Sequence, residues 1–343
     1  MKIAILSTIE PFIHGGAKKQ FTSLKNTLQT MNHQVDLFLI PFSFEINDLK
    51  PQIQAIRKIK INSDILITSR PMSYCIEHNN KIVWFMHHIS YFYEFYQTKL
   101  NPYPNNSDFA NTREEFIKQD TAFLLESKKI YAVSEYVADK LKLYNNIQSS
   151  IVYPFLDDYQ KFHFQNYSDY FYLPSLITYT KRQHLIIEAL LYTRNKIKLI
   201  LTGQVDKKYF KKYILPLLKK HKQIQERVKI LDKYLELEKY EYYANCLGVV
   251  FTPINEAFGF VVSESFFSFK PVITTIDSGA PAQIIKDKLT GLLVHPTPQQ
   301  IAQAMDTLYE NRHTLKTMGQ NCYSFALENF NPYKNAKKLL EDL

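Results

Sequence analysis

The chain has 343 residues, more than a single hydrophobic core usually organises, so we expect two domains. Its 45% hydrophobic and 22% charged residues are typical of a soluble globular protein, and no stretch is long and apolar enough to span a bilayer. The net charge of +9 leaves three kinds of partner open: nucleic acid, an anionic membrane surface or an anionic substrate. Cys75, Cys246 and Cys322 are few and far apart, which predicts a reducing cytosol and argues against a metal cluster.

Strand-like and helix-like stretches alternate along the whole chain, a pattern typical of parallel α/β architecture. Residues 1–6 are too short an apolar run for a signal peptide and predict a first strand. In the first half, we predict strands at residues 2–7, 34–40, 64–69, 81–86, 129–133 and 150–153. Helices are predicted at residues 17–31, 113–126 and 135–143, the last with Ser134 as its N-cap.

The alternation breaks around residues 157–170, where polar and aromatic residues predict a linker. Beyond it we predict strands at residues 170–173, 196–201, 228–231, 247–252, 271–275 and 292–295, with helices between them. Residues 298–343 read as wholly helical. We therefore expect a first domain at residues 1–158, a second at residues 159–325, and a C-terminal helix at residues 326–343 that packs back toward the first domain.

The densest basic run extends from Lys207 to Lys222. It is best interpreted as a solvated helix face whose apolar residues turn inward. Contact with a membrane surface is a weaker alternative, and nucleic-acid binding is weaker still. Pro216 is expected to interrupt this helix.

Two acids eight positions apart, Glu256 and Glu264, flank a Phe-Gly turn between a buried strand and a helix. The helix is expected to open at Gly259, and a helix N-terminus favours phosphate because it carries unpaired N–H groups and partial positive charge. The chain has only 8 glycines, where average usage would give roughly 24, so each glycine is expected to lie where a side chain would clash. Gly15 and Gly16 follow the first strand, and Gly279 lies in a second loop near the acids.

The stretch from Phe251 to Ser265 resembles the E-x7-E signature of glycosyltransferase family 4, and two blocks that follow, residues 270–285 and 290–294, keep the family's order and spacing. Shorter matches at residues 15–17, 132–137 and 181–189 extend the resemblance over nearly the whole chain. It implies the α/β GT-B fold, in which two Rossmann-like doubly wound parallel-sheet domains face a central cleft and the C-terminus is helical.

The resemblance also implies an activity: a retaining, metal-independent hexosyltransferase that moves a sugar from a nucleotide diphosphate sugar to an acceptor hydroxyl. The second domain would hold the donor and the first domain the acceptor. No cofactor is expected beyond this co-substrate, and no HExxH or Asp-x-Asp pattern predicts a metal ion.

The family's site residues can be carried over to matching positions of this chain. Glu264 would receive the ribose hydroxyls and Glu256 would lie near the donor sugar. Lys181 would neutralise the diphosphate, and amides around Phe258 and Gly259 would meet sugar or phosphate oxygens. Gly15, Gly16 and Arg182 complete the expected donor-binding set.

One position departs from the family pattern. Family members often carry an arginine where this chain has Leu176, in the loop that leads to Lys181. Losing such a phosphate clamp removes a contact of roughly 1.5–3 kcal/mol. Either Arg182 compensates, or the donor site is weakened or inactive.

His87 and His88 end the strand at residues 81–86. The resemblance implies that one of them, with His87 favoured, approaches the donor sugar as a catalytic residue beside Glu256. A core or capping histidine is the alternative. The aromatic run Tyr91–Tyr96 that follows is expected to pack in the core rather than stack on a sugar.

We expect a cytoplasmic enzyme of surface glycan or glycolipid synthesis, with a glycan, lipid-linked or protein acceptor and no nucleic-acid partner. Peripheral contact with the inner membrane face stays open. A non-catalytic protein that binds a sugar nucleotide or a partner enzyme is one alternative function, and a sugar-nucleotide epimerase on the same scaffold is another.

Overall fold

The computed structural model describes residues 1–10, 16–232 and 236–341 of the chain. The chain divides into two compact units: unit 1 comprises Met1–Asp157 and Pro332–Leu343, and unit 2 comprises Asp158–Asn331. Each unit contains one parallel sheet with helices, so the predicted pair of Rossmann-like domains is confirmed.

Two neighbouring acids mark the first boundary between the units. Asp157 accepts hydrogen bonds in unit 1, from Ser23 Oγ at 2.7 Å and Asn26 Nδ2 at 2.6 Å. Asp158 accepts one in unit 2, from Tyr240 Oη at 2.7 Å. The chain returns to unit 1 at Pro332, six residues beyond the predicted residue 326 (332 − 326), because helix α13 (Arg312–Asn329) runs on past that point.

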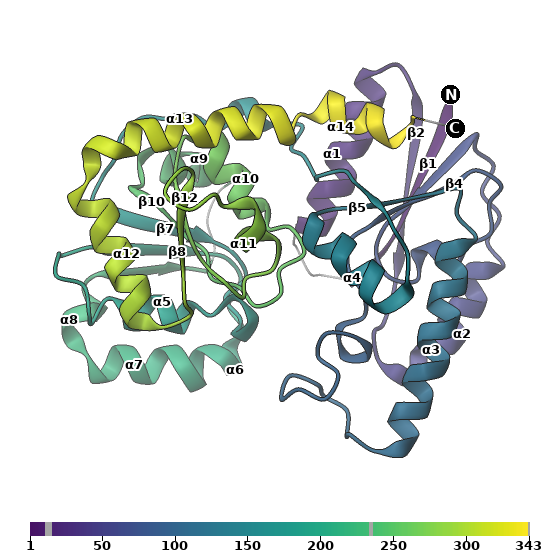
Figure 1. Ribbon diagram of the computed structural model, residues 1–343, viewed down its shortest axis with the longest axis horizontal. Helices are drawn as coiled ribbons and strands as arrows, with labels where there is room; N and C mark the ends of the chain where they lie inside the picture. The colour runs from purple at the N-terminus through teal and green to yellow at the C-terminus, as the bar shows by residue number, and fades with distance from the viewer. Residues whose placement is uncertain (11–15, 233–235, 342–343) are drawn as a thin grey trace. The chain divides into compact units, whose positions relative to one another are not determined.

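Unit 1 has a six-stranded parallel sheet with the strand order β2-β1-β3-β4-β5-β6 (Figure 1). Its strands are β1 (Lys2–Ile9), β2 (Gln34–Pro41), β3 (Ile65–Thr68), β4 (Lys81–Phe85), β5 (Lys129–Ala132) and β6 (Ser150–Ile151). Because β1, β3 and β4 are neighbours and run in the same direction, the loops that leave their carboxyl ends emerge side by side.

The helices of unit 1 are α1 (Gly16–Thr30), α2 (Ile46–Arg57), α3 (Ser107–Leu125), α4 (Glu135–Asn145) and α14 (Pro332–Leu339). Side chains cap two of them. Ser134 accepts from the Val137 N–H at 3.2 Å, as predicted for α4. Asn106 accepts from the Phe109 N–H at 2.9 Å, so α3 begins well before the predicted residue 113.

Unit 2 has a second six-stranded parallel sheet, with the order β12-β11-β10-β7-β8-β9. Its strands are β7 (Tyr170–Pro174), β8 (Lys198–Thr202), β9 (Val228–Leu231), β10 (Gly248–Val250), β11 (Val272–Thr275) and β12 (Gly291–Val294). Its helices are α5 (Gln183–Ala189), α6 (Lys207–Tyr209), α7 (Leu215–Lys220), α8 (Lys222–Gln225), α9 (Glu236–Asn245), α10 (Phe260–Phe267), α11 (Ala280–Ile284), α12 (Pro298–Glu310) and α13. The central strands β10 and β11 are buried throughout, as expected for a parallel sheet covered on both faces.

The basic run is a single helical rod, formed by α6, a π-helical segment (Phe210–Ile214) and α7. Lys207, Lys208, Lys211 and Lys212 are exposed while Tyr209 and Ile214 are buried, which confirms the interpretation as a solvated helix face. Pro216 does not break the rod, contrary to the prediction. The wider π turn precedes it, and the proline lies in the first turn of α7, where its missing N–H costs little.

All three cysteines are free and buried. Burial raises the pKa of the Cys75 and Cys246 thiols to about 12 and raises the pKa of Cys322 as well. The thiolate form that reacts is therefore strongly disfavoured at neutral pH. Within the described ranges, no helix has the length and apolar character needed to cross a membrane, and no three His, Cys, Asp or Glu side chains gather as metal ligands would.

The C-terminal helix α14 packs beside α1 in unit 1 (Figure 1). Ala336 and Leu339 are fully buried, Asn335 donates to the Tyr153 carbonyl at 3.0 Å, and Lys338 donates to the Ile151 carbonyl at 2.9 Å. The chain end therefore supports the β6 edge of the sheet.

Replacing Leu339 with alanine should lower the free energy of unfolding by about 2–4 kcal/mol, because the change leaves a cavity between α14 and its neighbours. Urea unfolding followed by circular dichroism would measure this loss. Lys337→Ala, on the exposed side of the same helix, is the matched control and should change stability by less than about 0.5 kcal/mol. Equal effects of the two changes would show that α14 is not docked.

Candidate active site

Two loops of unit 2 are joined at the carboxyl edge of its sheet, and Glu256 is their meeting point. The Glu256 N–H donates to the Ser278 carbonyl at 3.1 Å, and its own carbonyl accepts from the Ala280 N–H at 2.8 Å. A side chain on Gly279 (φ +73°) would place its Cβ only 2.5 Å from the Glu256 carbonyl oxygen. The loop after β10 and the loop after β11 can therefore approach this closely only with glycine at 279.

Glycine also opens helix α10, as predicted. Gly259 is the N-cap residue with φ +81°, and a Cβ there would lie 2.8 Å from the Phe251 ring. The α10 N-terminus thus follows Glu256 directly and presents N–H groups and partial positive charge at the same edge. Phe258, just before it, is buried against Phe260 and Phe330.

A third loop, which carries Lys181, reaches the same carboxyl edge of the sheet. It lies in a short 3-10 turn (Tyr179–Lys181) after β7, and its Nζ forms an ion pair with Oε2 of Glu256. The ammonium also lies 5.3 Å from the centre of the Phe251 ring, within range of a cation–π contact. Both partners keep about a fifth of their side-chain surface exposed, at 22% and 20%. The pair is therefore accessible to an incoming ligand.

Glu264 is more enclosed than its predicted role suggests. It lies on α10 and is 5% exposed. Its Oε1 accepts from Lys239 Nζ and its Oε2 accepts from Tyr243 Oη, both at 2.9 Å. Sequence reasoning missed Lys239 and Tyr243. Their spacing of four residues on a helix after β9 was the available signal, since it places both on one face.

Arg182 joins the loops at this edge of the sheet. Its guanidinium donates five hydrogen bonds of 2.6 to 2.9 Å to protein atoms: the Thr252 and Pro253 carbonyls, Thr275 Oγ1 and both carboxylate oxygens of Asp277. The side chain is buried, and the nearby guanidinium holds the pKa of Asp277 below its usual range although burial of that carboxyl acts in the opposite direction. These contacts use the Arg182 guanidinium to join loops, and its contact with the donor stays a prediction.

The loop around Leu176 is held without help from a cation. Gln183 donates to Ser175 Oγ at 3.0 Å and to the Leu176 carbonyl at 2.9 Å. A Cβ on Gly203 would lie 2.2 Å from the Ser175 carbonyl oxygen, so the loop after β8 closes against it. Leu176 is half-buried, and Lys181 is the basic residue that this loop presents to Glu256.

In unit 1, the predicted residues lie at the carboxyl ends of β1 and β4. Gly16 begins α1, and Gly15 lies outside the described residues, as does His14. His87 follows β4, is half-buried, and its Nδ1 lies 2.8 Å from the His88 carbonyl oxygen. The structure thus brings Lys181, Glu256 and Gly259 together in unit 2, and places Gly16 and His87 in unit 1.

His88 is a core residue. It is 3% exposed, its Nε2 lies 2.7 Å from Asn145 Oδ1, and its ring packs against Tyr93 with centroids 4.1 Å apart. Burial lowers its pKa to about 3, so the ring is neutral at physiological pH. These contacts agree with the preference for His87 over His88 as the site histidine.

A buried acid that the sequence analysis missed lies beside this histidine. Asp120 on α3 accepts hydrogen bonds from Tyr74 Oη at 2.6 Å and Tyr93 Oη at 2.5 Å. Its complete burial raises its pKa to about 6. Tyr93 belongs to the aromatic run, whose members Tyr91, Phe92 and Tyr93 are all buried, so the predicted packing role of the run is confirmed.

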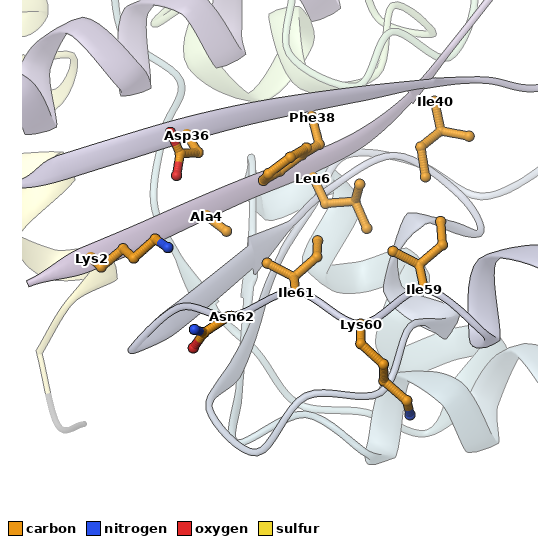
Figure 2. Close-up of a pocket in the computed structure, with 10 residues that line it drawn as sticks. All are labelled: Lys2, Ala4, Leu6, Asp36, Phe38, Ile40, Ile59, Lys60, Ile61 and Asn62. Carbon is orange, nitrogen blue, oxygen red and sulfur yellow. The ribbon is translucent and has the colours of Figure 1, made fainter.

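A cavity of about 280 Å³ lies elsewhere in unit 1 (Figure 2). Figure 2 shows that β1, β2 and the segment after α2 line it with ten residues: Lys2, Ala4, Leu6, Asp36, Phe38, Ile40, Ile59, Lys60, Ile61 and Asn62. The strand residues share one face of the sheet, as their spacing of two requires. None of the described predicted site residues lines this cavity, so it is separate from the candidate active site.

Comparisons with known proteins agree with this architecture. The model of the family described as Glycosyl transferases group 1 matches residues 154–325. Over 191 residues the chain is 26% identical to the human alpha-1,3/1,6-mannosyltransferase ALG2, covering 50% of this chain and 46% of that protein. The mouse protein is 32% identical over 96 residues, covering 28% of this chain and 23% of that one. The chain thus spans less than half the length of these curated relatives.

Solved structures resemble the whole chain in fold at low sequence identity. Sucrose-phosphate synthase from Thermosynechococcus elongatus has a TM-score of 0.80 at 15% identity, over 99% of this chain and 97% of that one. Anabaena Alr3699/HepE in complex with UDP has a TM-score of 0.72 at 16% identity, over 99% of both chains. These similarities confirm the expected GT-B fold.

Removing Lys239 should destabilise unit 2, because Glu264 would remain a buried carboxylate without its cation. We expect Lys239→Ala to lower the free energy of unfolding by about 3–5 kcal/mol. Adding Glu264→Gln to this variant should recover part of the loss, since the unpaired charge is then removed. Urea unfolding of the single and double variants measures both effects, and additive losses would contradict the coupling.

The pH dependence of stability should report on His88. Because its pKa in the folded chain is lowered from 6.5 to about 3, the stability that its neutral form contributes is complete above pH 6.5 and is lost as the pH falls toward 3. Asp120, with a raised pKa, acts in the opposite sense in the same range. In His88→Phe, the loss of unfolding free energy between pH 7 and pH 4.5 should be smaller than in the unchanged chain by roughly 2–3 kcal/mol. Parallel stability curves for the two proteins would exclude this role.

Proposed function

We propose a function on the premise that the chain belongs to the family Glycosyl transferases group 1, whose model matches half of its length. The proposed reaction is the transfer of a hexosyl group from a nucleotide diphosphate sugar to an acceptor hydroxyl, with retention of configuration at the anomeric carbon. One observation carries this proposal: Lys181, Glu256 and the α10 N-terminus meet where three loops leave the carboxyl ends of β7, β10 and β11.

This arrangement can stabilise a departing diphosphate. The Lys181 ammonium and the N–H groups at Gly259 supply positive charge from two directions, and neither requires rearrangement of a helix or strand. These two groups give the charge stabilisation that a divalent cation provides elsewhere, which is why we propose that transfer needs no metal ion. Activity that persists in excess chelator would test this part.

The Lys181–Glu256 ion pair suggests how donor binding could act on Glu256. In the structure, Glu256 neutralises Lys181. A phosphate oxygen that takes over Lys181 would release the Glu256 carboxylate, which can then accept a hydrogen bond from a hydroxyl of the donor sugar. Donor binding and positioning of Glu256 are therefore linked in this proposal.

Glu264 is the carboxylate to which we assign the ribose hydroxyls. A carboxylate can accept several hydrogen bonds at once, and Lys239 Nζ and Tyr243 Oη are among the donors to it. Their contacts fix the orientation of the carboxylate before ligand arrives, which lowers the entropy cost of binding. We assign His87, at the end of β4 in unit 1, to the positioning of the reacting sugar, with the acceptor hydroxyl attacking from the face that the diphosphate leaves.

The relatives support a nucleotide-sugar donor and a hexosyl group. Two curated relatives are mannosyltransferases, and solved structures of Anabaena Alr3699/HepE contain UDP or UDP-glucose. The acceptor we propose is a glycan or lipid-linked hydroxyl of a surface glycan or glycolipid, reached by a cytoplasmic enzyme.

Glu264→Gln and Lys181→Ala should each lower kcat/KM by about a hundredfold or more, because each removes charge stabilisation or donor orientation at the reacting end. A thermal-shift series with uridine, guanosine and adenosine diphosphates would first identify the base. Lys220→Ala, on the exposed face of α7, removes the same charge away from the site and serves as the control. If both site variants kept full activity, the assignment of the donor pocket would be wrong.

A second candidate function follows from Leu176. With Arg182 committed to loop contacts and leucine at 176, the β7 loop presents Lys181 but no arginine to a diphosphate. This favours, as the alternative, a protein that binds a sugar nucleotide without transferring the sugar. Stabilisation by a nucleoside diphosphate together with no turnover of its sugar on any acceptor class would select that alternative.

A further inference from the structure

Unit 1 contains an arginine that is buried but poorly satisfied. Arg70 lies directly after the carboxyl end of β3, and its side chain is 12% exposed. Its Nε is buried and has no hydrogen-bond partner among residues 1–10, 16–232 and 236–341. One terminal nitrogen lies 3.4 Å from the Thr8 carbonyl oxygen and the other lies 3.5 Å from Oε2 of Glu10, both at the limit of a hydrogen bond.

The backbone around Arg70 is held firmly, in contrast to its guanidinium. Ser73 Oγ donates to the Arg70 carbonyl at 2.7 Å and accepts from the Ser69 N–H at 3.1 Å. Thr8 Oγ1 donates to the Pro71 carbonyl at 3.0 Å, which joins this loop to the end of β1. The guanidinium is therefore presented from a rigid support, as a preorganised binding group would be.

Arg182 is a buried arginine whose guanidinium nitrogens all donate hydrogen bonds, and it serves as a comparison for Arg70. That side chain makes five short contacts, including a bidentate pair with Asp277. Arg70 has two long contacts, and burial lowers its pKa from the ordinary value of an arginine. A buried cation with so little compensation gains most from an anion that approaches its fork.

The acid beside Arg70 is partly exposed to solvent. This one acidic neighbour among the described residues, Glu10, is 44% exposed and can turn toward water. The Phe44 ring lies 5.4 Å from the guanidinium carbon and supports the planar group from one side. Because β3 lies between β1 and β4, Arg70 also shares a sheet edge with Gly16 and His87.

We propose that Arg70 binds an oxyanion, a phosphate or carboxylate group, carried by the acceptor substrate. This inference rests on the proposed function, since it concerns the substrate that unit 1 would hold while unit 2 holds the donor. The two oxygens of such a group match the two-pronged donor set of arginine, and Nε supplies one of the prongs. The acceptor's oxyanion would replace Glu10 as the partner of the guanidinium.

The direct test follows the Nε–H resonance of Arg70 in the full-length, isotopically labelled chain during titration with inorganic phosphate and, separately, with acetate. We expect a saturable shift of this resonance, and the stronger of the two titrations identifies the kind of oxyanion. The same shift should persist in Lys181→Ala, which disables the phosphate site proposed for unit 2. An Arg70 resonance that responds to neither anion would overturn the inference.

Variants separate a binding role from a structural ion pair. Arg70→Gln should weaken phosphate binding about tenfold to a hundredfold, and Arg70→Lys, which keeps the charge but loses the fork, should weaken it less. Glu10→Gln should hold or tighten binding, because it removes the competing carboxylate. Lys60→Gln is the control, since it removes one exposed positive charge from the same unit. If Glu10→Gln weakened anion binding as much as Arg70→Gln, the pair would be structural and the inference wrong.

Transfer assays distinguish this inference from the proposed function. With the donor identified, Arg70→Gln should raise KM for a sugar phosphate or a uronic acid acceptor and leave KM for the donor unchanged. Normal transfer by Arg70→Gln with unchanged acceptor KM would overturn the inference alone. An Arg70 resonance that responds to phosphate in a chain that binds no nucleoside diphosphate would instead overturn the proposed function.

Discussion

The candidate active site depends on the guanidinium of Arg182. This side chain leaves the start of α5 and binds the loop after β10 through the Thr252 and Pro253 carbonyls, and the loop after β11 through Thr275 and Asp277. Lys181, its neighbour, is thereby fixed opposite Glu256. Because parallel strands end at one edge of a sheet, loops far apart in sequence can be joined there by one buried cation.

The lysines and glutamates of the candidate active site are paired with one another, and this affects the free energy of ligand binding. Glu256 holds Lys181, and Lys239 and Tyr243 hold Glu264. A ligand must therefore exchange contacts rather than add them, so part of its interaction energy replaces bonds that the protein gives up. The half-buried pair, Lys181–Glu256, can exchange its partners for ligand atoms. The buried pair, Lys239–Glu264, keeps the Glu264 carboxylate in a fixed orientation. The two ion pairs thus have different roles within one site.

The sequence predicted the architecture well because its signals are local. The strands of both sheets lie at or within a few residues of their expected positions, and Ser134 caps α4 as its residue type indicates. Helix α2 escaped prediction: Pro51 inside it weakens its helical propensity, and burial of Leu49, Ile53 and Ile56 overrides this effect. The sequence predicted which residues belong to the site, but it did not predict which side chains those residues contact. Arg182 forms an ion pair with Asp277, 95 residues away, and His88 is buried beside Asn145. Both contacts depend on tertiary geometry, which local sequence patterns do not contain.

The burial of every thiol in the chain has a practical consequence. Cys75, Cys246 and Cys322 all lie inside the folded protein with raised pKa values, so alkylating dyes and spin labels should leave them unmodified in the native state. One cysteine introduced on the surface of each unit would then be the only labelled position there, without prior removal of native residues. Fluorescence energy transfer or paramagnetic distance measurements between such labels can test whether the distance between the two units changes when a nucleotide is added, in a protein whose interior is otherwise unaltered.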